Sequence, residues 1–169
     1  MNDDFTLVFV DTQSMYKACQ KEGVARLDYK KLLQMFSKRS GLLTSFWAGV
    51  YKGSMLKSES FEKFLKRLGF KIMHGFLDNQ EEGVVITDAF YKDMDKCGKF
   101  VMIGNSDEFV KLAEEAKKRN KNLEIWFTGF SGSNDYLKLA DTSLMVDVTK
   151  LAFEEKEKEE TDPSVAPAS

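Results

Sequence analysis

The chain has 169 residues, of which 43% are hydrophobic, so it is large enough to bury the core of one domain. Its formal net charge is −2, it opens with an acidic stretch in place of a secretion signal, and no apolar run approaches the roughly 20 residues of a membrane-spanning helix. These features argue against a secreted or membrane-embedded protein. We expect a cytoplasmic protein without a membrane partner, in which the widely separated Cys19 and Cys97 are free thiols.

Apolar runs and helical patterns alternate along the chain. They predict a strand at 5–10, helices at 14–23 and 27–41, a strand at 44–51, a helix at 58–69, strands at 69–76 and 99–104, a helix at 106–120, and strands at 123–127 and 143–148. Asp28 is the expected N-cap of the second helix, and Gly69 the expected end of the third. This alternation indicates an α/β domain built on a parallel sheet.

Charge is unevenly distributed along the sequence. Residues 1–75 carry 13 Lys and Arg against 7 acids, whereas residues 76–153 carry 10 against 14. A basic half beside an acidic half is typical of a polyanion partner together with an acidic site, although uneven surface charge alone also produces such a pattern. Residues 154–169 add six acids, two lysines and both prolines, so we expect a folded domain over 1–153 and a disordered tail over 154–169.

Two of the predicted strands lead directly into carboxylates. Asp11 ends the first strand, and Asp107 follows the strand at 99–104. Ligands of open parallel sheets bind at the carboxyl ends of the strands, beside the point where the strand order reverses. The pattern therefore predicts an acidic site at this edge. The alternative is that each Asp only caps the helix that follows it.

Six segments resemble, in matching order, the motifs of one family. VDTQSMY resembles its opening Asp-Gly-Ser-Asn-Leu-Tyr motif, and ARLDYKKLLQMFSKRSGLLTSFWAGVYKG and SFEKFLKRLGFKI resemble the helices and strands that come next. EEGVVITDAF carries two carboxylates at the family's spacing, IGNSDEF resembles the Ser-Gly-Asp-Ser-Asp-Phe segment, and YLKLADTSLMVDV resembles the closing motif. On these motifs the chain resembles the NYN domains, and among them the LabA-type branch of the PIN-like nucleases.

The resemblance implies a fold and an activity. The fold would be a PIN-like three-layer α/β sandwich around a mostly parallel sheet of five or six strands, in the order 3-2-1-4-5. The activity would be an endoribonuclease that depends on Mg²⁺ or Mn²⁺ and cleaves RNA phosphodiesters. The reversal of strand order would fall between the first and fourth strands, where Asp11 and Asp107 are expected to meet.

Carried over to this sequence, the family's acidic cluster consists of Asp11, Glu82, Asp88 and Asp107. Clustered carboxylates stay ionised when a divalent cation neutralises them, and hard oxygen ligands suit Mg²⁺ or Mn²⁺. Asp11, Asp88 and Asp107 are the expected metal ligands. Glu82 would bind through a water or act as the base toward the attacking water. Ser14 and Asn105 are auxiliary residues.

RNA, expected to be single-stranded, would approach over basic residues. The candidates surround the end of the second strand and the third helix: Lys52, Lys57, Lys63, Lys66, Arg67 and Lys71. Trp47 either stacks on a base or belongs to the strand core. His74, the only histidine, has no evident partner in the sequence and is expected to be structural.

Two departures from the family pattern leave a second function open. Asn105 stands where the family has an acid, and Thr12, Gln13 and Ser14 replace the family's loop. The alternative to a ribonuclease is therefore a catalytically degenerate NYN domain that regulates by binding RNA or protein. The sequence also leaves open whether the protein forms a homo-oligomer.

Overall fold

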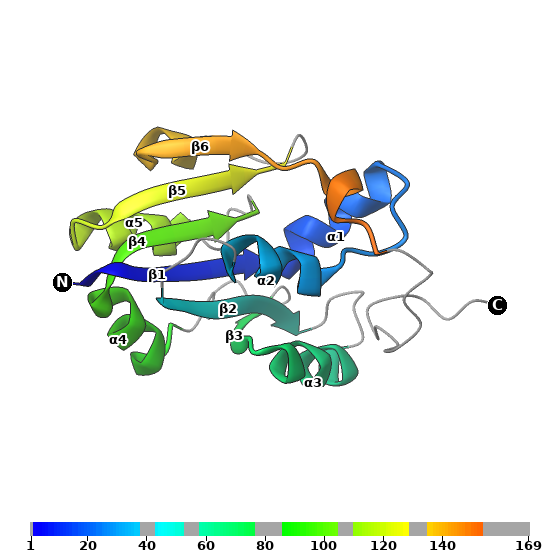
Figure 1. The fold of residues 1–169 in the computed structure, drawn as a ribbon, viewed down its shortest axis with the longest axis horizontal. Helices are drawn as coiled ribbons and strands as arrows, with labels where there is room; N and C mark the ends of the chain where they lie inside the picture. The colour runs from blue at the N-terminus through cyan, green and yellow to red at the C-terminus, as the bar shows by residue number, and fades with distance from the viewer. Residues whose placement is uncertain are drawn as a thin grey trace.

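A computed structural model of the chain describes residues 2–37, 43–52, 58–76, 86–104, 110–128 and 135–153. The elements follow one another as β1 (Asn2–Asp11), α1 (Thr12–Lys21), α2 (Tyr29–Ser37), β2 (Leu43–Lys52), α3 (Ser58–Leu68), β3 (Lys71–Phe76), α4 (Asp88–Lys96), β4 (Cys97–Ile103), α5 (Val110–Lys118), β5 (Asn122–Phe127), the 3₁₀ helix η2 (Asp135–Leu139), β6 (Thr142–Met145) and the 3₁₀ helix η3 (Val148–Leu151) (Figure 1).

The six strands form one parallel sheet in the order β3-β2-β1-β4-β5-β6. This confirms the predicted α/β class and strand order, with β6 added beside β5. β2 pairs with one side of β1, and β4, which comes later in the chain, pairs with the other side. Asp11 lies opposite Gly49 of β2, and Val10 lies opposite Ile103 of β4. The order therefore reverses between β1 and β4, as predicted.

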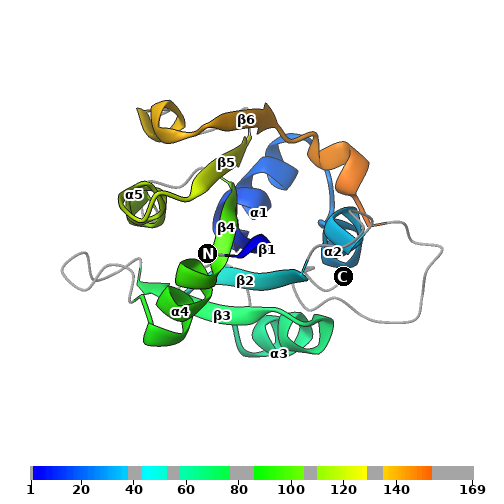
Figure 2. The ribbon, with the colours of Figure 1, turned by 60° about the vertical axis from the view of Figure 1, so that its left-hand side comes forward.

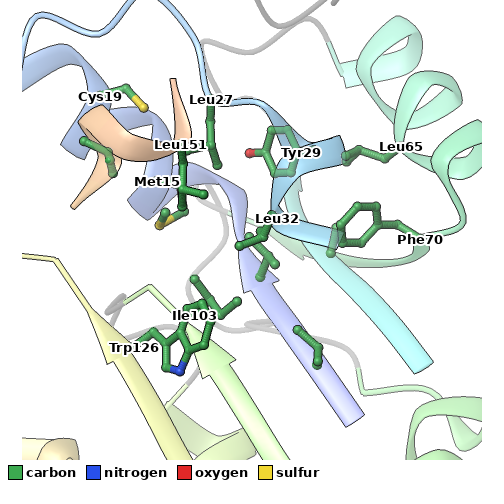
Figure 3. Packing of buried hydrophobic residues seen from close by; sticks show 14 of the residues in the cluster. Met15, Cys19, Leu27, Tyr29, Leu32, Leu65, Phe70, Ile103, Trp126 and Leu151 are labelled. Atoms are coloured by element: carbon green, nitrogen blue, oxygen red, sulfur yellow. The ribbon is translucent and has the colours of Figure 1, made fainter. Parts of the chain in front are cut away.

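The two faces of the sheet are covered by different helices, which gives three layers (Figure 2). Because strand side chains alternate, Val8 and Val10 belong to one hydrophobic cluster and Leu7 and Phe9 to another. The first cluster packs α1, α2, α3 and η3 against the sheet, with Met15, Leu32, Leu65 and Leu151 among its buried side chains (Figure 3). The second packs α4 and α5 against the other face.

Several local predictions are confirmed and one is wrong. Asp28 caps α2, because its Oδ1 accepts hydrogen bonds from the backbone N–H of Lys30 and Lys31 at 3.0 and 3.2 Å. Gly69 ends α3 with φ +109°. The strand predicted at 143–148 ends at Met145, since Asp147 caps η3 by accepting from the Thr149 N–H at 3.0 Å. The predicted tail, 154–169, lies outside the described residues.

Candidate metal centre

Asp11 is fully buried at the carboxyl end of β1. Its Oδ1 accepts hydrogen bonds from the backbone N–H groups of Gln13 and Ser14, at 3.1 and 3.2 Å, so it is the N-cap of α1. Asp11 therefore caps α1, and capping does not preclude a second role. Thr12 fixes the same turn to the neighbouring strand, since its hydroxyl donates to the Gly49 carbonyl at 2.7 Å.

The ends of β1 and β4 meet at Gly104. A Cβ added to this residue would lie 3.1 Å from the Cβ atoms of both Asp11 and Ser14. Gly104 also has φ +102°, a backbone conformation that L side chains rarely adopt, and its N–H donates to the Trp126 carbonyl at 2.8 Å. Gly104, the residue after β4, therefore lies directly against Asp11 and Ser14.

Asp88 lies on the same side of the sheet as the Asp11 side chain. By strand alternation Asp11 extends the row of Leu7 and Phe9, the row that α4 covers. Asp88 is the exposed first residue of α4, after the N-cap Thr87. Two residues on, Phe90 packs edge-on against Phe9 with ring centroids 6.2 Å apart.

The remaining acids of the predicted cluster, Glu82 and Asp107, lie outside the described residues, as do Asn105 and Lys57. Because α4 begins at Asp88, the spacing between Glu82 and Asp88 does not fall within this helix. Among the residues that the structure describes, no group of three or more His, Cys, Asp or Glu side chains is arranged to hold a metal ion. The four-acid cluster therefore stays a prediction.

The basic residues predicted to bind RNA lie mainly on α3. Lys63, Lys66 and Arg67 are exposed and, with Ser60, line a shallow surface depression. Phe61 and Leu65 on the inner side of α3 belong to the first hydrophobic cluster. The basic side chains are therefore on the layer opposite the face toward which Asp11 points. Lys52 ends β2, opposite Phe76 of β3.

Comparison with known proteins identifies the family of this chain. A family model described as NYN domain matches residues 5–147. The chain belongs to the NYN domain family. This confirms the resemblance noted in the sequence, and NYN domains are PIN-like nucleases that generally act on RNA with divalent metals.

The other comparisons add the fold alone. A crystal structure of a protein of unknown function from Vibrio parahaemolyticus resembles this NYN domain with a TM-score of 0.62 and 17% identity, over 86% of this chain and 94% of that one. No curated protein matches the chain. In the described part of this NYN domain, no helix has the length and apolar character needed to cross a membrane.

The chemistry of the described residues fits a hard divalent cation. Asp11 supplies a carboxylate, and Gln13 and Ser14 beside it supply neutral oxygens, which are the ligand types of Mg²⁺ and Mn²⁺. Thiolate chemistry is excluded, because Cys19 and Cys97 are buried free thiols and burial raises the pKa of each to about 11. Both thiols are therefore protonated at neutral pH.

Three other residues singled out in the sequence have structural roles. Trp47 is 3% exposed and donates from Nε1 to Asp93 Oδ2 at 2.9 Å, so it belongs to the core and does not stack on a base. Lys71 pairs with the same oxygen at 3.0 Å. His74 had no evident partner in the sequence, and the structure supplies one: its Nε2 contacts Glu62 Oε1 of α3.

Two residues near Asp11 were not predicted from the sequence to be site residues. Gly104 could have been found, because a glycine between a strand and Asn-Ser-Asp is a signal for a close backbone approach. Gln13 had no such signal, since a glutamine early in a helix is ordinarily exposed. In the structure it is 8% exposed.

Proposed function

We propose that this NYN domain is a divalent-metal-dependent endoribonuclease whose centre lies where β1 and β4 end. The observation that carries the proposal is the approach of Gly104 to Asp11 and Ser14. Asn105 follows Gly104 directly in the sequence and Asp107 comes two residues later, which supports their inclusion in the centre. Ligand sites of open parallel sheets occur at this point of strand reversal, and the family supplies the nuclease expectation.

In this proposal Asp11, Asp88 and Asp107 hold Mg²⁺ or Mn²⁺. When bound, such an ion polarises the scissile phosphate and lowers the pKa of a bound water. Asp11 is the central ligand, because the two backbone N–H groups of α1 fix its orientation before the cation arrives. Glu82 accepts the proton of the attacking water. Ser14 orients Asp11 or hydrogen-bonds a phosphate oxygen.

Single-stranded RNA would reach this centre around the carboxyl edge of the sheet. Lys63, Lys66 and Arg67 are on α3, which covers the face opposite to the Asp11 side chain. Contacts with phosphates at these positions hold the strand without reading its sequence. Lys52 ends β2 and Lys57 directly precedes α3 in the sequence, so the two lysines flank the link between the strand end and α3. Lys63, Lys66 and Arg67 therefore bind the RNA that flanks the cleaved bond and do not contact that bond.

The test compares wild type with Asp11→Asn in cleavage of single-stranded RNA in Mn²⁺. Asn is as good an N-cap as Asp, so the variant should fold with a metal-free melting temperature close to that of wild type. It should lose at least 100-fold in cleavage rate. Mn²⁺ should raise the melting temperature of wild type only. Full activity in Asp11→Asn would refute the assignment of the centre.

A second candidate, the degenerate regulatory domain, is favoured by one observation. Asp11 is 0% exposed and already serves as the cap of α1, which is sufficient to explain its position. Under this function the protein binds RNA or a protein partner without cleaving it. Wild type that binds RNA but cleaves none in Mn²⁺ would favour the regulator over the nuclease.

A further inference from the structure

Gln13 carries a buried polar group that the fold does not satisfy. It is the second residue of α1 and is 8% exposed. Its backbone N–H donates to Asp11 Oδ1, but its side-chain Oε1 is buried and accepts no hydrogen bond from the part of the chain that the structure describes. An unsatisfied buried acceptor destabilises a fold by about 1–3 kcal/mol. Native proteins keep few such groups, and each requires an explanation.

The position of Gln13 indicates where its missing partner would come from. Helical side chains lean toward the helix N-terminus, and at the second position of α1 this tendency directs a side chain toward the end at which Asp11 lies. A carboxylate and a carbonyl oxygen are thus collected at one end of α1. Of these oxygens, Oε1 of Gln13 has no donor among the described residues, and a cation bound at Asp11 would satisfy it.

We propose that Gln13 belongs to the metal centre, where its Oε1 enters the coordination shell of the divalent cation held by Asp11, directly or through a coordinated water. This inference rests on the proposed function, because it requires that a cation binds at Asp11. A neutral carbonyl oxygen adds a ligand without adding to the repulsion among the carboxylates. Mg²⁺ and Mn²⁺ accept such oxygens readily.

The experiment measures Mn²⁺ binding by the intact chain, with no RNA present. Gln13→Met has a similar length and no strong acceptor. Its metal-free melting temperature should equal or exceed that of wild type, because a buried unsatisfied oxygen is removed. Its Kd for Mn²⁺, measured by calorimetry, should rise about tenfold or more, as when a supporting ligand of a metal site is lost. Gln20→Met, an exposed position on the same helix, should change neither value.

A second variant gives an independent measurement should Gln13→Met fold poorly. Gln13→Glu keeps an oxygen ligand but adds a charge near Asp11. Its metal-free melting temperature should fall below that of wild type, and the increase produced by Mn²⁺ should be larger than in wild type. An increase equal to that of wild type would overturn the assignment of Gln13.

The outcomes separate this inference from the proposed function. If wild type binds Mn²⁺, Asp11→Asn does not, and Gln13→Met binds with unchanged Kd, Gln13 is not part of the centre while the centre stands. If Gln13→Met lowers the metal-free melting temperature at an unchanged Kd, Gln13 is structural. If wild type itself binds no Mn²⁺, both the inference and the metal-dependent function fail.

Discussion

Gly104 has two separate constraints, and a matched glycine allows them to be distinguished. Its φ of +102° is close to the +109° of Gly69, but a Cβ at Gly69 would meet nothing within 4 Å, whereas at Gly104 it would contact Asp11 and Ser14. We predict that Gly69→Ala loses about 1–2 kcal/mol of unfolding free energy through backbone strain. Gly104→Ala should lose about 1–3 kcal/mol more, since Asp11 and Ser14 must move. Urea unfolding measures both.

The Gly104 variant also has a functional expectation. Displacing Asp11 should weaken Mn²⁺ stabilisation in Gly104→Ala but not in Gly69→Ala. Equal unfolding free energies for the two variants would show that the approach of β4 to Asp11 is looser than 3.1 Å implies.

Asp93 is the buried carboxylate that holds α4 to the strands. Its Oδ2 accepts hydrogen bonds from Ser45 Oγ at 2.7 Å, Trp47 Nε1 at 2.9 Å and Lys71 Nζ at 3.0 Å. We predict that Asp93→Ala loses about 2–3 kcal/mol of unfolding free energy at neutral pH, because Trp47 keeps a buried unpaired donor. The exposed Asp95 on the same helix is the control: Asp95→Ala should lose less than about 1 kcal/mol.

The pH dependence of this stabilisation has a defined direction. Burial acts to raise the pKa of Asp93, but the three hydrogen bonds and the Lys71 charge outweigh it and lower the pKa. The folded pKa therefore lies below the unfolded value of about 3.9. The stabilisation is fully present above that value and is lost as the pH falls through the folded pKa. The difference between wild type and Asp93→Ala should shrink correspondingly in acid unfolding curves.

At the scale of elements, periodicity and end signals were sufficient for most of the fold. The alternation in β1 and the Asp28 cap of α2 depend on neighbouring residues alone, so the sequence predicts them. The partner of His74 and the network of Asp93 depend on side chains brought together from different elements, and no local pattern encodes them. The same reason explains why the burial of Gln13 was missed. Asp11 was predictable as a site residue because the carboxyl ends of parallel strands lie at one edge of the sheet, where ligands bind.

The layer of α3 gives a prediction about RNA affinity. Each phosphate contact with single-stranded RNA contributes a slope of roughly −0.7 to the dependence of log K on log salt. Replacing Lys63, Lys66 and Arg67 together with Ala should lower RNA affinity and make the slope shallower by about 2. Three exposed lysines on α4 and α5, on the opposite layer, form the control triple: Lys92, Lys111 and Lys118. If the control triple changes the slope and the α3 triple does not, the RNA runs over the other face.

At the scale of the whole molecule, the last described residues, 151–153, pack against the connection between α1 and α2. Leu151 is buried in the first cluster, the Phe153 N–H donates to the Arg26 carbonyl at 3.1 Å, and the Arg26 guanidinium lies 3.5 Å from the centroid of the Phe153 ring. Leu27 and Ala152 form an antiparallel bridge. These contacts hold the connection between α1 and α2 against residues 151–153.

Deleting residues 154–169 should therefore change the melting temperature by no more than about 2 °C, because this segment is poor in large apolar residues and the described contacts of Phe153 stay in place. A chain that ends after Asp147 is the matched comparison, since it also loses Val148 and Leu151, which are 3% and 7% exposed. Removing two buried aliphatic side chains should destabilise this shorter chain by several kcal/mol. That loss is a large fraction of the unfolding free energy of an ordinary domain. Circular dichroism melts of the three chains measure the effect. Loss of many degrees on removing 154–169 alone would place part of the tail on the core and extend the domain beyond residue 153.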